Sequence, residues 1–330
     1  MGIRNLNRYL RDNCPESIRC INMADLSGKR IAVDISIYLY KYEAENALLE
    51  NMYVMLSIFR YYNIIPIFIF DGKPPPEKKA LLLKRKEDKQ EAQEAYDKLK
   101  KQLTSLQETR ETDTDKLDII ASMEQLKSQI VQINKEKIEK VKTLIRAYGA
   151  TYYDAPGEAD ELCALLVIKK KVWACLSEDM DLFVYGCTRV LRYFSLIGHT
   201  AVLYYMKGIL EELNMTQTEF KENCVLSGTD YNINADGNND KVNLGITIKH
   251  FKKFKADKTN KTGFYDWLQD NTEYISDLEL LIKINKMFDL DVNNNLETFK
   301  SIKIINGPVR QEEIETIMKD EDFIFCKLQY

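Results

Sequence analysis

Three short apolar runs along the chain each end on acidic residues. Runs of this length, rich in Ile, Val and Phe, are typical of strands buried in a parallel sheet. Helical periodicity over residues 36–60 follows the first run, so the pattern predicts an α/β unit. Pro66 is expected to be the first residue of its strand, because proline cannot donate a ladder hydrogen bond. The runs cover residues 31–33, 64–70 and 172–176, and the acids after them are Asp34, then Asp71, then Glu178, Asp179 and Asp181.

These acids are expected to converge on one site. The carboxyl ends of parallel strands meet at one edge of a sheet, where such folds bind ligands. One Asp at a strand end is usually a cap or turn former, but three such ends together with Glu158 and Asp160 at a helix start favour a cluster. Glu161 is the weakest candidate, since adjacent helical residues point in different directions.

The residue types around this cluster restrict the metal that it could hold. The chain has only two His residues and no CxxC pair, so a zinc site is improbable. Carboxylate oxygens suit hard divalent cations, so Mg²⁺ or Mn²⁺ is expected. The sequence therefore predicts a metal-dependent phosphodiesterase.

Residues 77–148 contain neither Gly nor Pro and repeat aliphatic residues at helical spacing. The pattern predicts a helical hairpin that turns near residues 109–115. A charged hairpin of this kind is equally typical of a partner-binding coiled coil. Its basic start, from Lys73 to Lys86, is either a solvated face or a set of phosphate-binding groups beside the acids.

Alternating patterns predict further strands over residues 188–194 and 199–205, and a helix over residues 220–226. The loop over residues 232–243 has oxygen-bearing side chains but not the order of a calcium loop, so a turn is favoured there. A basic run interleaved with Phe follows, and one face of it is expected to contact a DNA duplex. The lysines assigned to this contact are Lys249, Lys252, Lys253 and Lys255.

Composition adds few limits. The 330 residues, 45% hydrophobic and 30% charged, allow one large or two modest domains. The formal charge of −4 decides nothing about nucleic acid, because a metal site concentrates acids locally. Seven cysteines without a CxxC pair favour a reducing intracellular compartment. The longest apolar run falls far short of the roughly 20 residues that cross a bilayer, so no membrane segment is expected.

Six motifs, taken in order, resemble those of the flap endonuclease family, the XPG-like structure-specific 5′ nucleases. The resemblance implies a PIN-like α/β nuclease domain with a mostly parallel central sheet, a helical arch insert and a helix-two-turn-helix-like C-terminal region. It also implies that seven acids bind two Mg²⁺ ions, with Mn²⁺ as a substitute, and that Asp181 is essential for cleavage. The motifs lie at residues 1–3, 31–34, 69–75, 155–160, 177–181 and 226–231, and the implied ligands are Asp34, Asp71, Glu158, Asp160, Asp179, Asp181 and Asp230.

The same resemblance assigns further roles. Lys78 and Arg85 would grip the scissile phosphate, Tyr40 would stack on a base, and Gly2 would lie near the site once Met1 is removed. The insert would be the arch that 5′ single strands thread or lean against. The implied segments are an N-terminal nuclease region at 1–76, an arch at 77–148, an internal nuclease region at 149–231, a duplex-binding segment at 232–262 and a helical region at 263–330.

Three departures from the family pattern qualify the expected substrate. The stretch between Asp34 and Asp71 lacks the loop that receives a 3′ flap, which argues against a strict double-flap preference. The Gly-Ile-Gly turn after Tyr231 is absent, so a monovalent-cation site there is expected to be altered. No sliding-clamp peptide is present before Tyr330.

The expected protein is a monomeric nuclease that acts on branched or 5′-ended DNA in replication or repair, in the nucleus or at a cytoplasmic replication site. It would leave a 5′-phosphate and a 3′-hydroxyl. A 5′ to 3′ exonuclease or junction-cutting relative, and a non-catalytic DNA-binding scaffold, are the alternatives.

Overall fold

A seven-stranded mixed sheet forms the centre of the molecule, with strand order β1-β7-β6-β5-β2-β3-β4. The structure is a computed structural model, and it describes residues 3–108, 119–120, 122–123, 125–127, 129–231, 242–257, 259, 261–290, 303–319, 323 and 325. The strands are β1 Ile18–Asn22, β2 Arg30–Asp34, β3 Ile65–Phe70, β4 Thr151–Asp154, β5 Ala174–Leu176, β6 Arg189–Ser195 and β7 Thr200–Tyr205.

Five neighbouring strands, β4, β3, β2, β5 and β6, run parallel, and β7 and β1 add antiparallel pairs at one side. Asp34 pairs with Ile69, and Val33 pairs with Leu176, so the three predicted strands end at the same edge. The predicted α/β fold with a mostly parallel sheet is therefore confirmed. Pro66 is the second residue of β3 and not the first; β4 begins opposite Ile67, so no strand lies beside Pro66 on that side.

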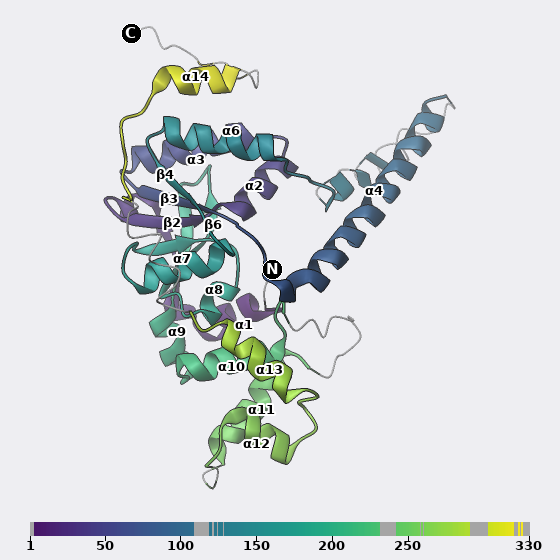
Figure 1. Cartoon of the computed structure of the whole chain (residues 1–330), viewed down its shortest axis with the longest axis vertical. Helices are drawn as coiled ribbons and strands as arrows, with labels where there is room; N and C mark the ends of the chain where they lie inside the picture. The colour runs from purple at the N-terminus through teal and green to yellow at the C-terminus, as the bar shows by residue number, and fades with distance from the viewer. Residues whose placement is uncertain are drawn as a thin grey trace.

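Helices cover both faces of the sheet (Figure 1). Alternation along β2 explains why both faces are apolar: Ile31 and Val33 enter one core, and Ala32 enters the other. The helices packed on the Ile31 side are α2 Ile35–Ala44, α3 Leu48–Tyr61, α6 Lys135–Ala147 and α14 Gln311–Lys319. Those on the Ala32 side are α1 Leu6–Asn13, α7 Ala159–Ile168, α8 Asp181–Val184 and α9 Met206–Leu213, which are continued by α10 Gln217–Ser227, α11 Leu244–Ala256, α12 Phe264–Asn271 and α13 Leu278–Met287.

The periodicity over residues 36–60 belongs to two helices and not to one. Helix α2 ends at Ala44 and α3 begins at Leu48, and Asn46 between them has a φ of 53°. That left-handed conformation is one that Asn tolerates better than most residues, and it ends helical hydrogen bonding. The connection between the two helices is therefore only three residues long.

Helix α4, Lys79–Glu108, extends away from the body of the molecule (Figure 1). It begins the predicted hairpin, whose expected turn at residues 109–115 lies outside the described residues. Helix α6 at the other end of the insert packs on α3, with Val141, Leu144 and Ile145 fully buried. The division of the chain into five segments remains a prediction.

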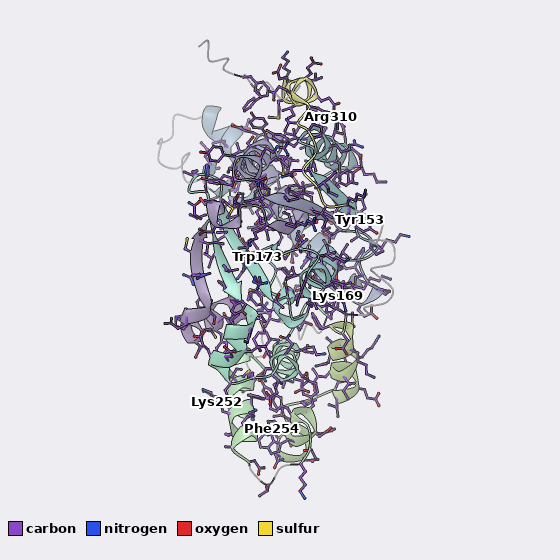
Figure 2. The ribbon with its side chains drawn as sticks, turned by 90° about the vertical axis from the view of Figure 1, so that its left-hand side faces the viewer. Tyr153, Lys169, Trp173, Lys252, Phe254 and Arg310 are labelled. Atoms are coloured by element: carbon purple, nitrogen blue, oxygen red, sulfur yellow. The ribbon has the colours of Figure 1, made fainter. Side chains whose placement is uncertain are left out.

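Helices α10 to α13 form a small group below the sheet in Figure 1, with α10 packed against α11 and α13. Phe251 and Phe254 of α11 contact Phe264 of α12. Figure 2 shows Lys252 and Phe254 at this end of the molecule, and Trp173 at mid-height on the same face. Among the described helices, none is both long and apolar enough to cross a bilayer.

Candidate metal centre

The ends of β2 and β3 place two acids side by side. Asp34 is the last residue of β2, only 5% exposed, and it accepts a 2.7 Å hydrogen bond from the Ser177 hydroxyl. Asp71 follows β3 and accepts hydrogen bonds from the Ser36 hydroxyl at 2.5 Å and from the Ala159 backbone N–H at 2.8 Å. Both carboxylates are thus oriented by neighbours that begin or precede helices.

A tight contact between two loops brings α7 to Asp71. The backbone N–H of Gly72 donates to the carbonyl of Gly157 at 2.7 Å. A Cβ atom at Gly72 would lie 2.0 Å from the Ala155 carbonyl oxygen, so only glycine allows this approach. The contact fixes the start of α7 beside the end of β3.

Helix α7 carries the second pair of acids at its first turn. Glu158 occupies the N-cap position of the helix, and its carboxylate accepts 2.7 Å hydrogen bonds from Lys78 Nζ and from the Tyr231 hydroxyl. Asp160 is 7% exposed, and one of its oxygens accepts a hydrogen bond from the Glu161 backbone N–H. The side chains of Glu158 and Asp160 therefore belong to one cluster.

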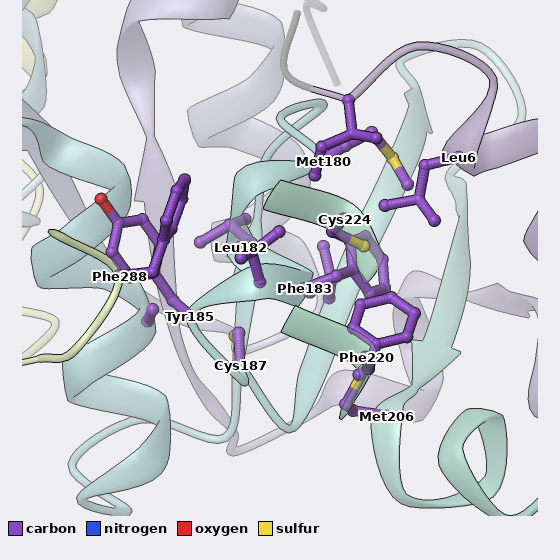
Figure 3. Close-up of a cluster of buried hydrophobic side chains, with 14 of the residues drawn as sticks. Leu6, Met180, Leu182, Phe183, Tyr185, Cys187, Met206, Phe220, Cys224 and Phe288 are labelled. Carbon is purple, nitrogen blue, oxygen red and sulfur yellow. The ribbon is translucent and has the colours of Figure 1, made fainter. Parts of the chain in front are cut away.

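The segment after β5 adds two more acids. Asp179 accepts a 2.9 Å hydrogen bond from the backbone N–H of Asp181, which begins α8. Asp181 is 1% exposed, and its Oδ1 atom has no hydrogen-bond partner within the described residues. Met180, Leu182 and Phe183 anchor this segment in an apolar cluster with Leu6, Phe220 and Cys224 (Figure 3).

Glu178 points away from the cluster. It pairs with Arg192, a buried side chain that also donates to the Glu178 carbonyl at 2.9 Å and to Asn7 Oδ1 at 2.6 Å. Arg192 therefore joins α1, β6 and the acidic segment. It is a positioning residue that sequence patterns did not single out, because an arginine in an alternating strand resembles an ordinary surface position.

Two cations near the start of α4 reach the acids. Lys78 is 7% exposed and lies 4.9 Å from the centroid of the Tyr231 ring while it contacts Glu158. Arg85 Nη2 lies 3.0 Å from Asp230 Oδ2. Helix α4 is thus tied to the acid cluster at its first turns. Tyr40 is exposed beside Lys89 of α4, and Gly2 lies outside the described residues.

Burial and the charges of neighbouring acids raise the pKa values of Asp34, Asp160, Asp179 and Asp181. Burial, together with the charge of Asp71, raises the pKa of Asp34 to about 7. Burial and the charge of Asp179 raise the pKa values of Asp160 and Asp181 well above the usual range. The charge of Asp230 also acts on Asp179 and Asp181. The seven predicted acids therefore form one electrostatically coupled group.

The residues present fit hard divalent cations, although the described residues hold no group of three acids already gathered in a ligand geometry. Two cationic side chains pair with acids at the edge of the cluster, and a buried carboxylate oxygen of Asp181 lacks a partner among the described residues. Buried, mutually repelling oxygens are unfavourable until positive charge neutralises them. The donor set is that expected for Mg²⁺ or Mn²⁺.

Some residues of the site carried no assigned role in the sequence. Ser177 holds Asp34, Ser36 holds Asp71, and Tyr231 holds Glu158 while it faces Lys78. Each lies within two residues of a predicted metal ligand in the sequence, and that proximity is the signal that could have found it. The four lysines assigned to duplex binding are exposed on α11, and Lys255 is paired with Glu219 at 2.8 Å.

Comparison with known proteins decides the family. The XPG N-terminal domain model matches residues 1–92, and the XPG I-region model matches residues 149–230. Flap endonuclease 1 of Nematostella vectensis is 30% identical over 268 residues, which cover 76% of this chain and 67% of that protein. The chain belongs to the flap endonuclease family.

Other relatives of the flap endonuclease family agree. Flap endonuclease 1 of Glossina morsitans morsitans is 32% identical over 250 residues, or 70% of this chain, and the match spans 61% of that relative's length. The catalytic core of Rad2 in complex with DNA substrate has the same fold, with a TM-score of 0.64 and 20% identity over 97% of this chain and 94% of that one. The predicted resemblance and fold are confirmed.

Proposed function

We propose that this member of the flap endonuclease family is a metal-dependent, structure-specific 5′ nuclease. It hydrolyses DNA phosphodiesters near single-strand/duplex junctions and leaves a 5′-phosphate and a 3′-hydroxyl. One observation carries the proposal: seven acids from the ends of β2, β3 and β5, from α7 and from the segment after α10 form a coupled cluster, with Lys78 and Arg85 at its rim.

The seven acids would hold two Mg²⁺ ions, for which Mn²⁺ could substitute. Bound metal ions supply an activated water and stabilise the leaving oxygen in phosphodiester hydrolysis. Ser36, Ser177 and Tyr231 hold Asp71, Asp34 and Glu158 in fixed orientations, so little reorganisation is needed when a substrate arrives.

Lys78 and Arg85 would bind the scissile phosphate. Both are paired with acids of the cluster, at 2.7 Å and 3.0 Å, so their charges already lie at its edge. A phosphate that enters would share these cations with Glu158 and Asp230. Arg85 is the better suited to two phosphate oxygens at once, because its guanidinium offers parallel donors.

Substrate choice would come from elements around the cluster. Helix α4 would guide the 5′ strand, Tyr40 would stack on a base, and the α11 lysines would hold the duplex backbone. The three-residue connection between α2 and α3 leaves no segment there to receive a 3′ flap. Single 5′ flaps would therefore be cut as well as double flaps. The short connection between α2 and α3 also favours exonuclease or junction-cutting activity as a second candidate function. The protein would act as a monomer in replication or repair.

A panel of labelled substrates tests the proposal: single 5′ flap, double flap, nicked duplex and four-way junction. We expect cleavage with Mg²⁺, none with EDTA, and flap rates that agree within about threefold, a difference of less than about 0.7 kcal/mol in transition-state binding. Asp181→Asn should abolish cleavage, whereas the exposed control Asp12→Asn should cut normally. Failure to cut any substrate in Mg²⁺ or Mn²⁺ would favour the non-catalytic scaffold.

A further inference from the structure

A basic groove lies at the end of the sheet opposite the acids. Its volume is about 710 Å³, and it is formed where β2, β3, β5 and β6 begin. The acids follow the other ends of β2, β3 and β5. Arg30 and Asp34 are the first and last residues of β2, so about 13 Å of strand separates the two sites at 3.3 Å per residue.

The side chains that line this groove are basic, although the chain as a whole is not. The chain has a net charge of −4, yet no acidic side chain lines the groove in the part of the chain that the structure describes. Lys207 pairs with Glu211, which lies outside the groove. The other cations form no ion pair with any described residue. The six cationic residues that line the groove are Lys29, Arg30, Lys170, Lys171, Arg189 and Lys207.

Arg189 lies between two aromatic rings. Its guanidinium carbon is 5.0 Å from the centroid of the Trp173 ring and 5.7 Å from that of the Tyr205 ring. Stacking of this kind orients a guanidinium without occupying its N–H groups. Tyr205 is 38% exposed, and Trp173 lies on the face of the molecule turned to the viewer in Figure 2, opposite the side from which α4 extends in Figure 1.

We propose that this groove binds a segment of single-stranded DNA. Oriented guanidinium donors suit phosphate, and the surrounding lysines follow a charged backbone. Partly exposed aromatic rings within a basic groove suit unpaired bases, whose faces are free to stack, better than they suit an acidic peptide or a paired duplex. A volume of about 710 Å³ is also that of a ligand-sized cleft.

The inference rests on the proposed function only in taking DNA as the partner. The groove would hold a strand away from the acids, in a contact that requires neither divalent metal nor cleavage. Binding there would retain a displaced strand while its junction is cut at the other edge of the sheet.

Binding without metal tests the groove directly. The probe is a fluorescein-labelled oligothymidylate of about twelve nucleotides, within the span that single-strand grooves cover, and its anisotropy is measured in EDTA. The groove variant is Lys170→Glu with Lys171→Glu. Its charge-matched control is Lys303→Glu with Lys319→Glu, two exposed lysines whose side chains form no ion pair with the described residues. Circular dichroism confirms that each variant folds.

Loss of two phosphate contacts should lower the magnitude of the slope of log K against log salt by about 1.4. If the variant and the wild type bind equally at 1 M salt, this change makes the variant bind about 25-fold more weakly at 0.1 M salt. The control should bind like the wild type. Arg189→Lys should also bind more weakly although its charge is kept, since lysine lacks the planar donors and the stacking. Equal losses in the groove and control variants would overturn the proposal. So would displacement of the probe by oligoglutamate, or by a duplex of equal length, as readily as by unlabelled oligothymidylate.

Cleavage of a 5′ flap in Mg²⁺ provides the separate readout for the metal centre. If the wild type cuts no substrate while the groove variant loses oligothymidylate binding, the proposed nuclease function fails and the groove stands. If the wild type cuts and the groove variant binds the oligothymidylate normally, the groove inference fails and the nuclease stands.

Discussion

Replacement of Asp181 by Asn should make the metal-free protein more stable. Asp181 is 1% exposed, its Oδ1 atom has no partner among the described residues, and the charges of Asp179, Asp230 and Glu158 all act against its ionisation. Two unit charges about 4 Å apart repel by about 4 kcal/mol at an effective dielectric constant near 20. Lys78 offsets part of this repulsion.

Protonation of acids within the cluster already reduces the remaining repulsion, so the Asp181→Asn substitution does not gain the full Coulomb energy. An unsatisfied buried polar group costs about 1–3 kcal/mol, and Asn introduces N–H donors beside ionised carboxylates, which can only accept hydrogen bonds. We therefore expect the unfolding free energy of Asp181→Asn in EDTA to exceed that of the wild type by about 1–3 kcal/mol.

Urea denaturation followed by tryptophan fluorescence measures this difference, with Trp173 and Trp267 as probes. The exposed control Asp12→Asn should change stability by less than about 0.5 kcal/mol. Mg²⁺ at about 100 times its dissociation constant should stabilise the wild type by about 2.7 kcal/mol and the variant by less. An Asp181→Asn protein that is less stable than the wild type in EDTA, or that gains as much from Mg²⁺, would refute a strained acid cluster.

Three further predictions concern residues that support the cluster. Lys78→Ala and Arg85→Ala should each slow single-turnover cleavage by about 10²–10³-fold, because stabilisation of the transition-state phosphate is lost. The control variant Lys86→Ala, at an exposed neighbouring residue, should cut at the normal rate. Normal rates for all three variants would contradict the phosphate assignment. Gly72→Ala should destabilise the fold by about 1–3 kcal/mol in urea denaturation, since its Cβ would meet a backbone oxygen. At Gly157 a Cβ would meet nothing nearer than 3.8 Å, so the control Gly157→Ala should be tolerated. Equal losses of stability in the two variants would disprove the close contact. Arg192→Lys should lower both stability and the cleavage rate, because lysine cannot reach Asn7 and the Glu178 carbonyl together; full cleavage activity would show that the acidic segment needs no such anchor.

Much of the candidate site could be predicted because its acids end continuous apolar runs. Asp34 is the last residue of a strand buried on both faces, and Asp71 and Asp179 follow two more such strands, which have a strong local signature. Strands β1 and β4 were not predicted. Both are partly exposed, so neither has a continuous apolar run or a clear alternation.

Other features depend on contacts between distant segments. Lys78 follows three prolines and precedes a charged helix, which is the pattern of a surface residue, yet tertiary packing leaves it 7% exposed. The break between α2 and α3 depends on the backbone of Asn46, because the apolar spacing continues across it. Asp230 could be placed beside the other acids only through the family resemblance, since no apolar run precedes it.

The sheet order has a consequence for how the protein is made. Strand β2, formed from residues near the start of the chain, pairs with β5 only when Ala174 and its neighbours are present. Asp230, the last of the seven acids, comes later still. Contacts of such long sequence separation form late, because the intervening loop must first be closed. A growing chain on the ribosome therefore carries an incomplete cluster until the segment that contains Asp230 has emerged.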